Sequence, residues 1–130
     1  MGISVEWFDV EQTIIYQRIR ELFAWDDFHA QDTTIKAMIA SVTHPVCMVV
    51  DVQDFSMRNA PGGVLTHIRM TMPGFPDNLT CIVVIADTIF GMSLFKMVQR
   101  LGFIGPGCQF HVVNSLEEAQ TFLDISWSKG

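Results

Sequence analysis

Two apolar runs constrain the fold of this chain more than any other feature of its sequence. Val46 to Val52 reads Val-Cys-Met-Val-Val-Asp-Val, and Leu79 to Ala86 reads Leu-Thr-Cys-Ile-Val-Val-Ile-Ala. A strand with one wet face alternates apolar and polar residues, whereas runs as continuous as these are typical of strands covered on both faces. We therefore expect two central parallel strands with helices packed against them, which is an α/β fold.

The segments around these runs alternate between strand and helix patterns. Ile3 to Phe8 and Thr13 to Ile19 are rich in β-branched and aromatic residues and predict an antiparallel hairpin. Apolar residues at helical spacing predict helices from Trp25 to His44 and from Pro61 to Met72, and a third after Asp87 and Thr88. On the third, we expect a buried face formed by five residues, Phe90, Leu94, Met97, Val98 and Leu101.

A last strand and a last helix complete the predicted order. Phe110 to Val113 is the strand, and Ser115 with Glu118 forms a capping box that begins a helix running to about Ile125. The order is β-β-α-β-α-β-α-β-α, with a mostly parallel sheet of about five strands and the hairpin at its edge. Residues 1–126 form one domain, and residues 127–130 are a frayed tail.

Composition excludes several classes of function. A net charge of −6 repels the phosphates of a nucleic acid, and 49% hydrophobic residues exclude a disordered chain. No apolar run reaches the roughly 18 residues of a membrane span. Cys47, Cys81 and Cys108 lack metal or disulfide spacing and are expected to be free thiols, which favours a cytoplasmic location.

The predicted order and the corner after Val46–Val52 resemble the STAS domain, the family named for sulphate transporters and anti-sigma-factor antagonists. In that family the third strand ends in an aspartate, as Asp51 does here, and an Asp-Ser-Ser-Gly-like motif starts the next helix. Asn59-Ala60-Pro61-Gly62 stands at that place, followed by the apolar helix start Val64-Leu65. The resemblance covers nearly the whole chain by topology, and its residue matches lie around this corner.

The chain departs from the family at the phosphorylated serine. By this alignment the serine falls on Ala60, which has no hydroxyl, and the second serine of the motif is Pro61. The resemblance therefore implies a regulatory module without the phospho-switch of the antagonists. Ser56 is a conceivable substitute, but a serine in a loop more often solvates that loop.

The motifs of common enzymes and cofactor sites are missing. Pro61-Gly62-Gly63 could face an anion at a helix start, but neither nucleotide-binding glycine fingerprint is present, so we read these residues as a tight turn. A receiver domain would need an acidic pair after the first strand and a lysine after the last. His67 is expected to be a structural or surface histidine. We expect no enzyme, no metal and no cofactor.

The sequence leaves two binding functions open. The first is protein docking at the corner, through Asp51, Arg58, Asn59, Ala60, Pro61, Gly62, Gly63 and Thr88. In this interpretation Asp51 braces the loop by accepting amide hydrogen bonds. The second is a carrier of a lipid or other small apolar ligand between the helices, with four candidate contacts, Met72, Phe75, Met92 and Phe95. Met92 and Phe95 would also suit pairing with a second copy of the chain, which makes a self-assembling structural domain a third reading.

Overall fold

The computed structural model describes residues 3–20, 24–53, 63–100 and 107–127. Its strands are β1 (Ile3–Trp7), β2 (Ile14–Ile19), β3 (Val46–Asp51), β4 (Leu79–Ile85) and β5 (Gln109–Val113). Its helices are α1 (Trp25–Ala40), α2 (Val64–Thr71), α3 (Ile89–Arg100) and α4 (Leu116–Trp127). The predicted α/β class and element order are confirmed.

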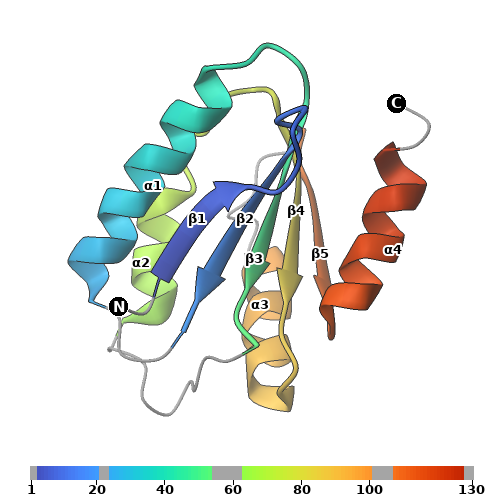
Figure 1. The fold of residues 1–130 in the computed structure, drawn as a ribbon. Helices are drawn as coiled ribbons and strands as arrows, with labels where there is room; N and C mark the ends of the chain where they lie inside the picture. The colour runs from blue at the N-terminus through green and yellow to red at the C-terminus, as the bar shows by residue number, and fades with distance from the viewer. Residues whose placement is uncertain (1–2, 21–23, 54–62, 101–106, 128–130) are drawn as a thin grey trace.

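The five strands form one sheet in the order β1-β2-β3-β4-β5. β1 pairs antiparallel with β2, and the remaining neighbours are parallel. Because each parallel strand is added on the same side of the last, right-handed crossovers place α1, α2 and α3 on one face. The fourth helix lies on the opposite face, as Figure 1 shows.

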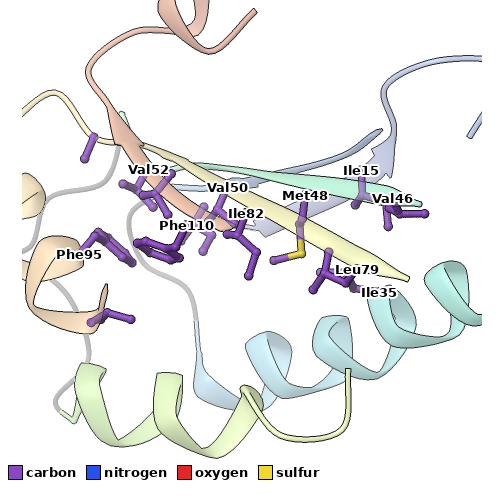
Figure 2. Packing of buried hydrophobic residues seen from close by; sticks show 14 of the residues in the cluster. Ile15, Ile35, Val46, Met48, Val50, Val52, Leu79, Ile82, Phe95 and Phe110 are labelled. Atoms are coloured by element: carbon purple, nitrogen blue, oxygen red, sulfur yellow. The ribbon is translucent and has the colours of Figure 1, made fainter. Parts of the chain in front are cut away.

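The alternation of side chains divides the core into two clusters. On the face covered by α1–α3, strand residues such as Met48, Val50 and Ile82 pack with Ile35 of α1 and Phe95 of α3. Figure 2 shows the strand side chains of this cluster projecting toward the helices. A smaller cluster on the other face joins alternate residues of β2–β4 to α4, namely Ile14, Cys47, Val49, Cys81, Val83, Ile85, Ala119 and Leu123.

Local polar bonds fix several element ends. Asp9 accepts hydrogen bonds from the amides of Thr13 at 2.9 Å and Ile14 at 3.0 Å, which orders the hairpin loop. The capping box is present, with the Glu118 amide donating to Ser115 Oγ at 3.0 Å. Glu118 Oε1 accepts from the amide of Asn114 at 2.8 Å, one residue before the position that the motif predicts.

One expectation about the helices was wrong. Met97 is 44% exposed and faces away from the sheet, whereas Phe95 and Val98 are buried. The apolar residues of α3 extend around more of the helix than the face that packs, so spacing alone does not select that face. The last helix, expected to run to about Ile125, is described as far as Trp127.

Within the part of the chain that the structure describes, no helix is both long enough and apolar enough to cross a membrane.

A cavity between the sheet and three helices as candidate functional site

The segment after β3, together with Thr88, was expected to dock a partner. Those of its residues that the structure describes lie at the carboxyl edge of the sheet. Asp51 ends β3, Gly63 precedes α2, and Thr88 precedes α3. In open α/β sheets this edge is where ligands usually bind. Arg58, Asn59, Ala60, Pro61 and Gly62, together with Ser56, lie outside the described residues.

Asp51 is only 6% exposed, and its carboxylate is committed to the fold. It accepts a hydrogen bond from the Gln53 amide at 2.9 Å and another from the Tyr16 hydroxyl. Burial, the bond to Asp51 and the charge of that carboxylate together raise the pKa of Tyr16 from 10.0 to about 12. Tyr16 therefore remains a protonated donor, and Asp51 holds the backbone of Gln53 at the end of β3.

Gly63 and Thr88 both shape helix starts. Gly63 has φ +80°, a left-handed conformation that a β-carbon disfavours. Thr88 Oγ1 accepts from the Gly91 amide at 3.0 Å, as an N-cap does. A β-carbon added to Gly91 would lie 2.9 Å from that hydroxyl oxygen, so glycine leaves room for the cap.

A cavity of about 80 Å³ lies between the sheet and α1–α3, and we call it the helix-side cavity. Its floor comes from the strands and the residue after β3, with Met48, Val50, Val52, Ile82, Val84 and Phe110 among its residues. Its helix side includes Trp25, Phe28, Ile35, Ile68, Phe95 and Val98, and Met72 and Phe75 follow α2. Of the four apolar contacts expected from the sequence, Met72, Phe75 and Phe95 therefore line one cavity. Met92 packs against the same core without lining it.

Three polar side chains also reach the wall of the helix-side cavity: Gln17, Asp32 and Thr71. Gln17 Nε2 donates to Gln31 Oε1 at 3.1 Å. Thr71 Oγ1 donates to the Ile68 carbonyl at 2.9 Å, and Asp32 forms an ion pair with Lys36 at 2.8 Å. The wall is otherwise dominated by apolar side chains.

Lys36 joins α1 to the segment after α2. Besides its ion pair with Asp32, its ammonium group donates to the Pro73 carbonyl at 2.9 Å. The same group lies 4.9 Å from the centre of the Phe75 ring, within the range of a cation–π contact. Lys36 thus holds a residue of the cavity wall in place.

An aromatic and histidine cluster lies beside the cavity, formed by Trp25, His29 and His67. The rings of Trp25 and His67 are stacked, with centroids 4.1 Å apart and planes at 9°. His29 Nε2 and His67 Nδ1 are 2.8 Å apart, so one ring donates a hydrogen bond to the other. Trp25 belongs to both the cluster and the cavity wall.

The three cysteines are free, as expected. Cys47 and Cys81 are opposite each other on β3 and β4, and both are buried. The hydrogen bond between them, together with burial, raises the pKa of Cys47, and the same bond lowers the pKa of Cys81.

Sequence reasoning missed Gln17, Trp25 and His29. Gln17 had a visible signal, because it lies between Ile15 and Ile19 on one face of a strand. Trp25 and His29 are four residues apart on a helix and so share a face. Among the described residues, no group of three histidine, cysteine, aspartate or glutamate side chains is placed to hold a metal ion.

Comparisons with protein-family models, with curated proteins and with solved structures give no match to this chain.

Proposed function

We propose that this chain is a non-enzymatic binding module and that the helix-side cavity holds a small apolar ligand. The observation that carries the proposal is the cavity of about 80 Å³, whose lining is almost entirely apolar. A buried water needs two to four polar partners, and two of the three polar side chains already use their groups within the protein. An apolar molecule fits this lining better than water does.

The packing around the cavity supports the same proposal. Apolar side chains that face unfilled space lack the dispersion contacts of a close-packed core. A ligand that fills the space would supply those contacts.

Protein docking at the sheet edge is the second candidate, and it is the function that a STAS-like module implies. Its support is the position of Asp51, Gly63 and Thr88 at the carboxyl ends of adjacent strands. Because Ala60 and Pro61 carry no hydroxyl, such docking would proceed without the family's phospho-switch. Stable phosphorylation of Ser56 that changed partner affinity would contradict this form of the proposal.

The location of the protein is also a proposal. Three free thiols, two of them buried, fit a reducing compartment such as the cytoplasm.

Native mass spectrometry of gently purified protein separates the two candidate functions. A carrier should show a reproducible adduct on the mass of the bare chain, and the adduct mass would define the ligand class. A bare monomer or dimer would favour docking and direct the work to affinity capture with variants of Gly63 and Thr88.

A further inference from the structure

Gln17 is the polar group of the helix-side cavity whose hydrogen-bonding capacity is least used. It lies on β2, opposite Val50 of β3, and is 3% exposed. Its Nε2 donates to Gln31 Oε1 at 3.1 Å. Within the residues that the structure describes, its Oε1 has no hydrogen-bond donor. A buried amide oxygen without a donor is uncommon in folded proteins, because it has given up its water.

The other two polar groups of the wall are already engaged. Thr71 donates to the Ile68 carbonyl, and Asp32 is paired with Lys36. The rest of the lining is almost entirely apolar, and burying an unpaired charge against it would be costly. A ligand that satisfies Gln17 should therefore be neutral and should carry a donor.

The size of the cavity limits the ligand further. About 80 Å³ is several times the 10–15 Å³ that one water needs, and about half of a cavity known to bind benzene. We propose that the ligand is a neutral aliphatic molecule, or the end of a longer chain, whose single hydroxyl or equivalent donor bonds to Gln17 Oε1. This inference rests on the proposed function and adds the chemistry of the ligand.

Two isomeric probes test the donor directly. 1-Butanol and diethyl ether have the same atoms and nearly the same volume, but only 1-butanol donates a hydrogen bond. Each is titrated into the protein, and the methyl resonances of the cavity residues are followed by NMR. We expect 1-butanol to bind about 3- to 10-fold more tightly than the ether, the difference that one neutral hydrogen bond makes.

Variants assign the difference to Gln17. In Gln17→Met, which keeps the length of the side chain, the two probes should bind equally within about twofold. Gln31→Met is the matched control, because it removes the partner of Gln17 Nε2 and leaves Oε1 in place. This control should retain the preference for 1-butanol.

The outcomes separate the inference from the function on which it rests. Equal binding of the probes by the unaltered protein, or tighter binding of the ether, overturns the inference and leaves an apolar binding site. No binding of either probe overturns both. Because the comparison of probes uses the unaltered chain, it stands even if Gln17→Met does not fold.

Discussion

The side-chain amide of Asn78 contacts three backbone carbonyls where α1 ends and the chain continues toward β3. Its Nδ2 lies 3.0 Å from the Ile39 oxygen, 3.2 Å from the Val42 oxygen and 3.1 Å from the His44 oxygen. Ile39 is in the last turn of α1, whereas Val42 and His44 follow the helix, so this amide joins the helix end to the segment after it. The Asn78 carbonyl also accepts from the Val46 amide at 2.8 Å, where β3 begins.

Asn78→Asp should therefore destabilise the protein by about 1–3 kcal/mol, because a carboxylate cannot donate and is repelled by the carbonyls at the helix end. Urea unfolding at neutral pH measures the loss. Asp77→Asn is the control, since it changes the exposed neighbour and should alter stability by less than about 0.5 kcal/mol. Equal stability of the two variants would contradict this role of Asn78.

The raised pKa of Tyr16 makes the folding stability of the protein depend on alkaline pH. Its pKa in the folded protein is about 12, above the ordinary value of 10.0, so the folded state holds the proton more tightly than the unfolded state. The resulting stabilisation is fully present below pH 10 and is lost as the pH rises from 10 to 12.

In Tyr16→Phe this contribution disappears, so stability should fall less steeply between pH 10 and 12 than in the unaltered protein. At neutral pH the variant should be less stable by about 1–3 kcal/mol, because buried Asp51 loses its hydroxyl donor. Denaturation midpoints at pH 9 and pH 11 measure both effects. If the stability of Tyr16→Phe and of the unaltered protein falls in parallel between pH 9 and pH 11, the hydrogen bond between Tyr16 and Asp51 does not raise the pKa of Tyr16.

At the scale of elements, contacts made by Lys36 of α1 hold the segment that follows α2. Lys36→Met keeps an aliphatic chain of similar length but removes the ammonium contacts to Asp32, Pro73 and Phe75. The expected loss is about 1–2 kcal/mol, the sum of a partly exposed ion pair, one hydrogen bond and one cation–π contact.

Amide hydrogen exchange measures the local effect of Lys36→Met. Protection should fall at Met72, whose amide donates to the Ile68 carbonyl at 3.2 Å just before Pro73, and remain unchanged in β4. Lys96→Met, which removes an exposed positive charge from α3, is the matched control. If the Met72 amide exchanges alike in both variants, Lys36 does not hold this wall of the cavity.

The elements also show what sequence could and could not predict. Apolar runs identified β3 and β4 because central parallel strands leave no polar face. The capping box located α4 because its signal is local. The bonds of Asn78 span 34 to 39 residues along the chain, so no local pattern indicated them. The buried face of α3 was partly misassigned because its apolar residues extend around more of the helix than the face that packs.

At the scale of the whole molecule, the order of strands explains where the cavity lies. Successive right-handed crossovers in one direction put α1, α2 and α3 on the same face of the sheet. Met72, Phe75 and Phe95, three of the four apolar residues proposed from the sequence as ligand contacts, line this cavity. The strand order and the helical spacing of these residues were enough to predict that they lie on the same face. The open space between them depends on the packing of side chains from several elements, and no sequence pattern encodes it.

Xenon binding tests the central claim most directly, because xenon enters dry apolar cavities without needing a polar partner. In ¹²⁹Xe NMR the unaltered protein should shift the xenon resonance in a saturable way. Val84→Leu adds a methylene to the cavity wall and should weaken this shift. Val83→Leu changes the neighbouring residue, which faces α4, and should leave it intact. An unaltered protein that gives no saturable shift, or variants that behave alike, would contradict a ligand site between the sheet and the helices.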